Sequence, residues 1–408
     1  MTVEIKRKLK SIINRTSLLQ KLVFWYLNHQ ADIAKRNILR RKREKANSTI
    51  KVGFIVQMPE VWDKEAPVYE RMITDKRFDA WLIVVPKYDF IQKKDGDLGE
   101  ECEYFLKKYP CCNYILHDKN KWHLDDSFDY IFYQRCWEEY LPEDLRSKHV
   151  IKKALICYTP YCYHGAPEST SYYQTSFFRY LTNFYCCSID QRDQVKEIGH
   201  IDARYMGFPL FDTLKYDKSL NSSNLIKVLW TPRWTDDDYL GGSTFLDYKD
   251  KILDLTGNKK VKLILRPHPL AFDKAMRDQE MTKAEVDAYR IKVMESGASF
   301  DENAMIEETF VDTDLLVTDF SSVIISFFLS GRPIIYCAKF DIDTTDIFRR
   351  ILDVTYKAPD WNEVLQLVEN ISEGRDPLKE KREALISQLS IPHNSVEHIL
   401  DDLEQSLR

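Results

Sequence analysis

Short apolar runs alternate with helical or polar segments along most of the chain. Continuous apolar runs of this length are typical of strands that are buried on both faces of a parallel sheet. A helix is predicted at residues 68–76, between the first two runs. The alternation predicts a doubly wound α/β domain in the first half of the chain. Its strands are predicted at residues 51–56, 80–85, 113–116, 130–133 and 153–158.

A second series of the same kind follows a polar stretch at residues 215–224. Two α/β domains joined by a polar hinge predict a cleft, in which ligands lie at the carboxyl ends of the strands. The strands are predicted at 227–230, 261–265, 315–318 and 333–337, with helices in 273–295 and 380–408. The predicted limits are 1–48 for an N-terminal segment, 49–214 and 223–385 for the domains, and 386–408 for a closing helix.

The composition is that of an ordinary globular protein. The 408 residues are 44% hydrophobic and 30% charged, which excludes disordered and collagen-like chains. No apolar run approaches the length needed to span a bilayer, and the N-terminus lacks the pattern of a signal peptide. The nine cysteines include no C-x-x-C pair and no zinc-like spacing, so we expect reduced thiols in a cytosolic protein.

Positive charge is concentrated at the N-terminus. Residues 1–51 carry 14 Lys and Arg against three acidic residues, a net charge of +11, whereas the remaining 45 basic and 61 acidic residues give −16. Apolar residues recur at helical spacing over 5–13, an aromatic patch follows at 18–27, and a basic run lies at 40–43. This pattern predicts a basic amphipathic helix on an anionic membrane surface; the alternative is a solvated helix packed on the body. Nucleic-acid binding is not predicted, because the basic surface ends there.

The segment 312–336 parses as strand, tight turn, helix and strand. Asp319 ends the first strand, and Ser321 and Ser322 fall where the helix begins. Hydroxyl and backbone N–H groups at a helix N-terminus favour a phosphate. The alternative is that Asp319 or Ser321 only caps the helix.

A second candidate lies at residues 263–269, where a buried strand ends in Arg-Pro-His-Pro. The prolines restrict the backbone, so Arg266 and His268 are expected to be held at the carboxyl end of the strand. Arginine binds phosphate bidentately, and histidine donates to it or protonates a leaving oxygen.

Two loops carry further candidates. His164 precedes a glycine in the loop after the last strand of the first series, where a neutral imidazole could accept a proton from an attacking hydroxyl. Alternatively, His164 is a loop histidine that caps a carbonyl group. Thr231 and Arg233 follow the first strand of the second series and either touch a ligand or form a structural turn. Three carboxylates at 236–238 read better as a solvated loop than as an ion site, so no metal is assigned.

Taken together, these elements resemble the CDP-glycerol glycerophosphotransferase family of teichoic-acid primases and polymerases. The matching segments are Val-Thr-Asp-Phe-Ser-Ser (317–322), Arg-Pro-His-Pro (266–269), His-Gly (164–165), Met-Gly-Phe-Pro-Leu-Phe-Asp (206–212) and Thr-Pro-Arg-Trp (231–234). The P-loop, the dinucleotide-binding fingerprint and the nucleophile-elbow motif do not occur, which argues against P-loop kinases, dehydrogenases and serine hydrolases.

The resemblance implies a GT-B-like fold with two Rossmann-like domains, the N-terminal one for the acceptor and the C-terminal one for CDP-glycerol or a related CDP-polyol. It implies transfer of a polyol phosphate to a hydroxyl of a lipid-linked or capsular, teichoic-type glycan, with release of CMP and no cofactor. His164 would be the general base, Arg266, His268, Ser321 and Ser322 would bind the pyrophosphate, and Asp319 would support the turn. A cytoplasmic protein, peripheral on the inner face of a bacterial membrane, is expected.

The sequence departs from the family pattern around the expected donor and acceptor contacts. The loop after His164 lacks the usual lysine, Tyr163 replaces a tryptophan and Leu210 replaces a common arginine. Two rival interpretations remain: a GT-B glycosyltransferase that uses a nucleotide sugar for surface polysaccharide, and a non-catalytic binding module at the membrane.

Overall fold

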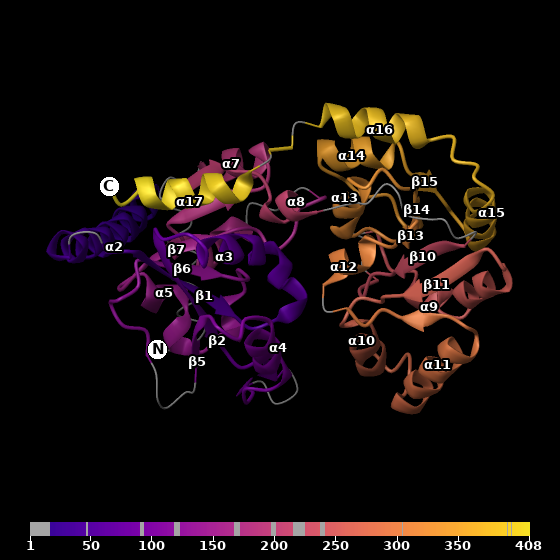
Figure 1. Ribbon diagram of the computed structural model, residues 1–408, viewed down its shortest axis with the longest axis horizontal. Helices are drawn as coiled ribbons and strands as arrows, with labels where there is room; N and C mark the ends of the chain where they lie inside the picture. Colours follow the sequence, from indigo (N-terminus) through magenta and orange to yellow (C-terminus); the bar gives the residue numbers. More distant parts are fainter. Residues whose placement is uncertain are drawn as a thin grey trace. The chain divides into compact units, whose positions relative to one another are not determined.

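The protein folds into two compact units, each built on its own parallel sheet (Figure 1). The first unit comprises residues 1–161, 169–213 and 392–408, and the second comprises 162–168 and 214–391. The computed structural model describes residues 17–45, 48–89, 94–117, 123–166, 172–196, 201–214, 225–236, 241–303, 305–389, 391–392 and 394–408. The predicted hinge at 215–224 and the apolar positions at 5–13 lie outside these ranges.

The sheet of the first unit has seven parallel strands in the order β5-β2-β1-β6-β7-β8-β9. The five runs predicted from sequence all form strands, and β8 and β9 extend the sheet beyond them. The bounds are β1 Ile50–Val56, β2 Phe78–Val84, β5 Asn113–Leu116, β6 Tyr130–Tyr133, β7 Leu155–Tyr158, β8 Asn183–Cys186 and β9 Asp202–Tyr205. A small antiparallel hairpin, β3 Tyr88–Asp89 with β4 Lys94–Asp95, lies apart from this sheet.

Both faces of the first sheet are buried, which explains the continuous apolar runs. Phe54 and Phe132 face one core, whereas Ile55 and Ile131 on the same two strands face the other. The helices of this unit are α2 Ser17–Glu44, α3 Ala66–Met72, α4 Glu100–Lys108, α5 Ser147–Val150, α6 Ser176–Tyr180, α7 Ile189–Lys196, α8 Pro209–Thr213 and α17 Ser395–Gln405.

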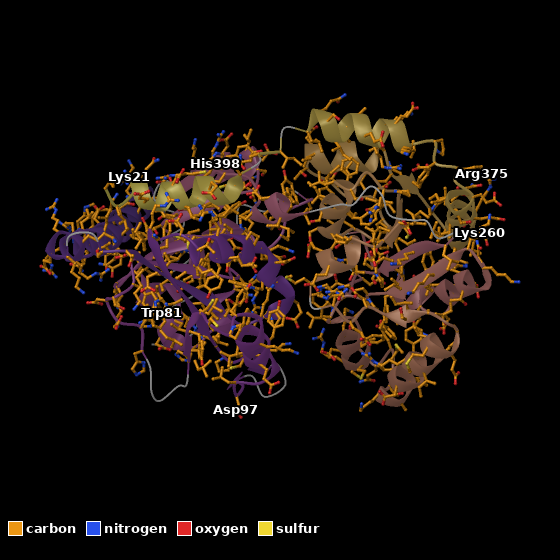
Figure 2. The ribbon with its side chains drawn as sticks, viewed as in Figure 1. Lys21, Trp81, Asp97, Lys260, Arg375 and His398 are labelled. Atoms are coloured by element: carbon orange, nitrogen blue, oxygen red, sulfur yellow. The ribbon has the colours of Figure 1, made fainter. Side chains whose placement is uncertain are left out.

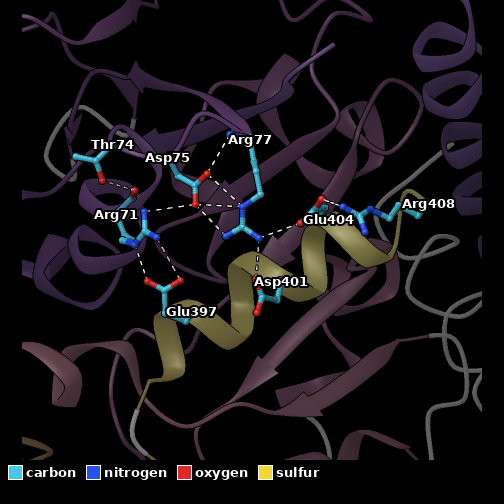
Figure 3. A network of polar contacts seen from close by, with 8 residues as sticks. All are labelled: Arg71, Thr74, Asp75, Arg77, Glu397, Asp401, Glu404 and Arg408. Carbon is cyan, nitrogen blue, oxygen red and sulfur yellow. Dashed lines mark hydrogen bonds and ion pairs between the residues drawn. The ribbon is translucent and has the colours of Figure 1, made fainter. Parts of the chain in front are cut away.

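The last helix, α17, belongs to the first unit although it ends the chain (Figure 1). Its apolar face, which includes Ile399 and Leu403, is fully buried in that unit's core. Its polar face pairs with arginines of the same unit: Arg77 contacts Asp401 and Glu404, and Arg71 contacts Glu397 (Figure 3). The segment predicted as a closing helix at 386–408 is therefore divided: α16 ends in the second unit, and residues 392–408 return to the first.

Helix α2 is amphipathic, as predicted for the basic N-terminal segment. Leu27, Ala34 and Ile38 are buried against the first unit. Leu22, Trp25 and Tyr26 on its N-terminal half are exposed, Trp25 by 64%. The helix thus has one face packed on the body and a separate exposed group of large apolar side chains. In the described part of the chain, no helix combines the length and apolar character needed to cross a bilayer.

The sheet of the second unit has six parallel strands in the order β12-β11-β10-β13-β14-β15. The four predicted runs form strands, and β12 and β15 add a two-residue strand at each edge. The bounds are β10 Ile226–Thr231, β11 Val261–Leu265, β12 Ser299–Phe300, β13 Leu315–Thr318, β14 Ile334–Tyr336 and β15 Tyr356–Lys357. Trp230, Leu265 and Val317 lie together in the core on one face.

The charged segment predicted as helical at 273–295 is interrupted. A left-handed residue, Gln279 with φ of 60°, follows the first helix, and Thr282 begins the second with a capping box to Glu285. The helices of the second unit are α9 Phe245–Tyr248, α10 Ala271–Arg277, α11 Lys283–Glu295, α12 Ile306–Phe310, α13 Val323–Phe328, α14 Asp346–Leu352, α15 Trp361–Ser372 and α16 Lys379–Gln388.

Charged side chains such as Lys21, Lys260 and Arg375 project from the surfaces of their own units, whereas Trp81 is half-buried (Figure 2). All nine cysteines lie in the described ranges, and none forms a disulfide.

Candidate functional site

Three of the four candidate motifs follow neighbouring strands of the second sheet. The chain proceeds from β10 through β11 to β12 on one side, and from β13 through β14 to β15 on the other. The strand order therefore reverses between β10 and β13, where Thr231 pairs with Thr318. In doubly wound sheets, the crevice at the carboxyl ends of such strands is where ligands bind. The sequence motifs thus lie at the position that the topology favours.

Asp319 holds the loop that follows β10. It is fully buried, and its Oδ2 accepts hydrogen bonds from the backbone N–H groups of Arg233 (2.9 Å) and Thr244 (3.0 Å). The Thr244 hydroxyl donates to Oδ1. Burial raises the pKa of Asp319 to about 6, although these hydrogen bonds lower it. Asp319 therefore acts as a buried support for the loop and does not cap α13.

Thr231 and Arg233 differ in their surroundings. Thr231 is buried, and its hydroxyl donates to the Thr318 hydroxyl at 2.8 Å. This hydrogen bond agrees with a structural role, the alternative to ligand contact for this residue. Arg233 is half-buried, and its Nε donates to the Thr235 hydroxyl at 2.8 Å. Of the two, Arg233 is the one whose side chain lies near the surface of the unit.

Arg266 is held by a carboxylate that the sequence reading did not identify. Its Nη1 contacts Asp301 Oδ2 at 2.5 Å and the Asn303 carbonyl oxygen at 2.7 Å. Asp301 follows the edge strand β12, and its Oδ2 also accepts from the Thr309 hydroxyl. A guanidinium fixed in this way is oriented before any ligand arrives.

His268 lies beside the Arg233 loop. Its backbone N–H donates to the Pro232 carbonyl oxygen at 3.2 Å, and its ring stacks on Trp234 with centroids 5.6 Å apart. The Leu270 N–H donates to His268 Nδ1 at 3.1 Å, so the neutral ring carries its proton on Nε2. Part of the residue faces solvent, yet the protein packed around the ring and, secondarily, the Arg233 charge lower its pKa to about 4. His268 is therefore a neutral N–H donor near pH 7.

Ser321 and Ser322 form the turn before α13 and are half-buried. Ser322 makes no side-chain capping bond, and Ser321 Oγ accepts only a long hydrogen bond from the Val323 N–H, at 3.4 Å. The helix N-terminus thus has no strong side-chain cap. Helix α13 has only six residues, so few peptide dipoles add up at its N-terminus.

The His164 loop is the fourth motif, and its residues 162–168 are part of the second unit. The Gly165 carbonyl oxygen accepts a hydrogen bond from the Thr345 N–H at 2.8 Å, at the start of α14. The His164 side chain is half-buried, with Nε2 3.9 Å from Cys162 Sγ.

Close packing ties this loop to the Asp319 turn. A Cβ added to Gly165 would lie 2.7 Å from the Phe348 ring, so any larger residue would force the loop or the ring to shift. The same Phe348 ring contacts Phe320, next to Ser321, with centroids 5.5 Å apart. One phenylalanine therefore connects the loop of the candidate base to the candidate phosphate turn.

Asp236 has a structural partner. Both of its carboxylate oxygens lie 3.2 Å from Lys339 Nζ, and Oδ1 accepts from the Ser243 N–H. Residues 237 and 238 lie outside the described ranges. Within those ranges, no group of three His, Cys, Asp or Glu side chains is arranged to hold a metal ion.

Sequence reasoning missed the supporting residues Thr244, Asp301, Thr345 and Phe348. Each is far along the chain from the group that it contacts, so no local spacing points to it. The exception is Thr244, which follows two glycines with positive φ, Gly241 and Gly242; such a Gly-Gly pair signals a tight loop near a strand end.

Comparison with known proteins agrees with the motifs. Residues 204–377 match the model of the CDP-glycerol:poly(glycerophosphate) glycerophosphotransferase family. This range contains three of the four motifs, and His164 precedes it. The resemblance read from the sequence is thereby confirmed over these residues. No curated protein sequence matches the chain.

Solved structures with the same fold include one variant of the wall teichoic acid polymerase TagF, with 12% identity and a TM-score of 0.57 over 100% of this chain and 98% of that one. A TagF structure soaked with CDPG has 12% identity and a TM-score of 0.52 over 96% and 98% of the two chains. A putative UDP-N-acetylglucosamine 2-epimerase from Listeria monocytogenes has 12% identity and a TM-score of 0.54 over 88% and 96%. These likenesses confirm the predicted GT-B-like fold of two Rossmann-like domains.

Proposed function

We propose that this protein is a glycerophosphotransferase. It transfers a polyol phosphate, with glycerol phosphate first among the candidates, from a CDP-activated donor to a hydroxyl of a glycan. This glycan is lipid-linked or capsular and of the teichoic type. The observation that carries the proposal is that contacts connect the four motifs to one another. Asp319 holds the Arg233 loop, that loop contacts His268, and Phe348 links Phe320 to Gly165.

The reaction is an in-line displacement at the β-phosphorus of the donor. The acceptor oxygen forms the new bond to phosphorus, the bond to the bridging oxygen breaks with its electron pair, and CMP leaves. His164 accepts the proton of the attacking hydroxyl.

Charge that develops on the leaving phosphate is met by groups of the second unit. Arg266 is oriented by Asp301, and His268 presents Nε2–H as a neutral donor. The Ser321 and Ser322 hydroxyls and the adjacent backbone N–H groups add further donors. Such preorganised donors and cations stabilise a transition state electrostatically. Turnover in EDTA is therefore expected; loss on chelation that Mg²⁺ restores would contradict it.

The test is to incubate the protein with CDP-glycerol or CDP-ribitol and a lipid-linked acceptor, and to follow CMP. We expect CMP release that depends on the acceptor and falls about 10²- to 10⁴-fold in His164→Ala. His398→Ala, at an exposed position on α17, serves as the control. Activity with nucleotide sugars instead, giving a product without phosphate, would identify a glycosyltransferase. A parent protein that releases no CMP, together with a His164→Ala variant that loses no function, would favour a binding module.

We propose further that α2 holds the protein on the inner face of the cell membrane. Its support is the exposed Leu22, Trp25 and Tyr26 group beside the cations of the same helix, since aromatic and apolar side chains insert at the interface and cations attract anionic lipid. Trp25→Ser with Leu22→Ser should release the protein from anionic vesicles and leave turnover on a soluble acceptor unchanged. Unchanged vesicle binding would contradict the proposal.

A further inference from the structure

The first sheet reverses its strand order in the same manner as the second. The chain passes from β1 through β2 to β5 on one side, and from β6 through β7 and β8 to β9 on the other. The reversal therefore lies between β1 and β6, which pair from Val52–Tyr130 to Ile55–Tyr133. The proposed donor site uses the reversal point of the second sheet, whereas nothing described above uses this one.

The two reversal points are built alike. Gln134 follows β6 directly, as Asp319 follows β13. Its Oε1 accepts from the backbone N–H groups of Gln57 (3.0 Å) and Met58 (2.9 Å), in the loop after β1. Its Nε2 donates to the Met58 carbonyl oxygen at 2.6 Å. In both sheets a buried side-chain carbonyl or carboxylate thus fixes the loop that follows the neighbouring strand.

Arg135, the next residue, presents a guanidinium at this point. Its Nη2 donates to Gln57 Oε1, and its guanidinium carbon lies 5.9 Å from the centre of the Tyr140 ring. Gln57 is itself fixed, because its Nε2 donates to the carbonyl oxygens of Pro86 (2.7 Å) and Tyr140 (2.9 Å). The guanidinium is therefore held in place by neutral groups.

Arg135 makes no ion pair with any residue that the structure describes. Among the described residues no carboxylate lies within ion-pair distance of it, although Glu60 and Glu139 contribute weaker, more distant interactions. Burial lowers the pKa of Arg135, and the more distant Glu60 and Glu139 offset this only in part. Arg266, by contrast, contacts the buried carboxylate of Asp301. A half-buried cation of this kind is costly unless an anion joins it.

We propose that Arg135, held by Gln57 and Tyr140 at the reversal point of the first sheet, binds a phosphate group of the acceptor substrate. The identity of the acceptor rests on the proposed function, whereas the binding of a phosphate at Arg135 does not. A guanidinium with a fixed fork suits a phosphate monoester or diester, which it contacts through two N–H groups. A phosphate could also come from the donor, and the experiment separates the two sources.

The experiment measures binding of glycerol 3-phosphate by calorimetry with the full-length protein, in the presence of saturating CMP to fill the donor site. Arg135→Gln removes the charge, Arg135→Lys keeps it without the fork, and Arg146→Gln is the control in the same unit, where Arg146 pairs with Glu143. We expect Arg135→Gln to weaken binding at least about tenfold, the loss of one charge-assisted hydrogen-bonded contact, and Arg135→Lys to weaken it less. Arg146→Gln should stay within about twofold of the parent.

Steady-state kinetics then identify the source of the phosphate. An acceptor KM raised in Arg135→Gln with an unchanged Kd for CDP-glycerol supports the proposal. A raised Kd for CDP-glycerol with an unchanged acceptor KM overturns it in favour of a donor phosphate. A lowered melting temperature with all binding unchanged in both variants also overturns it, because Arg135 would then be structural only. If no variant or parent releases CMP but glycerol 3-phosphate binding still depends on Arg135, the proposed function fails and the phosphate site remains.

Discussion

The reversal points of the two sheets share a construction and differ in charge. In the second unit an acidic side chain, Asp319, supports the loop, and the nearby cation Arg266 is paired with Asp301. In the first unit a neutral side chain, Gln134, supports the loop, and the cation Arg135 contacts Gln57 and Tyr140, with no carboxylate of the described residues within ion-pair distance. The comparison teaches that a segment can be easy to recognise in the sequence without holding the cation that is most available to bind an anion. The recognisable motif holds a cation that a carboxylate orients, whereas the unrecognised segment holds a cation with no carboxylate partner among the described residues.

The largest expected effect comes from removing the acidic support. Asp319→Ala leaves the buried N–H groups of Arg233 and Thr244 without an acceptor, which costs about 2–4 kcal/mol of stability in the second unit. Because the loop then moves, we expect the Kd for CDP-glycerol to rise about 10²-fold. Calorimetry measures this Kd, and hydrogen exchange at the two amides reports the loop.

Matched variants determine whether the two supports are equivalent. Asp319→Asn retains a carbonyl oxygen for the backbone N–H groups and should lose much less affinity for the donor. Gln134→Ala should loosen the loop after β1 and raise the acceptor KM, with the Kd for CDP-glycerol within about twofold of the parent. The two supports would not have separate roles if the Kd for CDP-glycerol were unchanged in Asp319→Ala. The same would follow if this Kd changed strongly in Gln134→Ala.

The architecture of the two sheets was largely predictable, because buried parallel strands leave continuous apolar runs. The edge strands β12 and β15 were not, since two residues carry no periodic signal. The break between α10 and α11 was missed because the charged sequence has no proline or glycine there, and Gln279 adopts a positive φ instead.

The motifs of the candidate site could be predicted from the sequence, but the hydrogen bonds and ion pairs that connect them could not. Arg266 and His268 were identified because they follow a buried strand and alternate with two prolines. The partner of Arg266 is 35 positions away, directly after the edge strand β12, and only the sheet order brings Asp301 to it. Arg135 was not singled out at all, because its significance depends on the pairing of β1 with β6 and on the absence of a carboxylate near it among the described residues.

An intermediate effect is expected where the His164 loop packs on α14. Gly165→Ala places a Cβ within 2.7 Å of the Phe348 ring, so the loop must shift. If Gly165 and Phe348 position His164, kcat should fall about 10- to 10²-fold while the Kd for CDP-glycerol changes little. Steady-state kinetics combined with donor titration measure the two quantities.

Two further variants separate positioning from general destabilisation. Gly257→Ala, in the same unit, adds a methyl group where nothing lies within 4 Å and should leave kcat unchanged. Phe348→Leu combined with Gly165→Ala should recover part of the lost kcat, because the smaller side chain makes room for the Cβ. Failure of this rescue at unchanged thermal stability would contradict a positioning role for Phe348.

The smallest expected effect is the pH dependence of stability and donor binding. It arises in the second unit alone, since the Arg135 guanidinium at the reversal point of the first sheet does not titrate near neutrality. The pKa of His268 is lowered from 6.5 to about 4, so the unfolded chain binds this proton more readily between these values. Its contribution to stability is complete above pH 6.5 and is lost as the pH falls toward 4.

A bound diphosphate would favour the imidazolium form of His268 and raise its pKa. Donor affinity should therefore increase as the solution is acidified, while the acceptor KM stays constant. An NMR titration with and without CDP-glycerol, assigned with His268→Gln, measures the shift. A pKa that does not move when the donor binds would place the diphosphate away from His268.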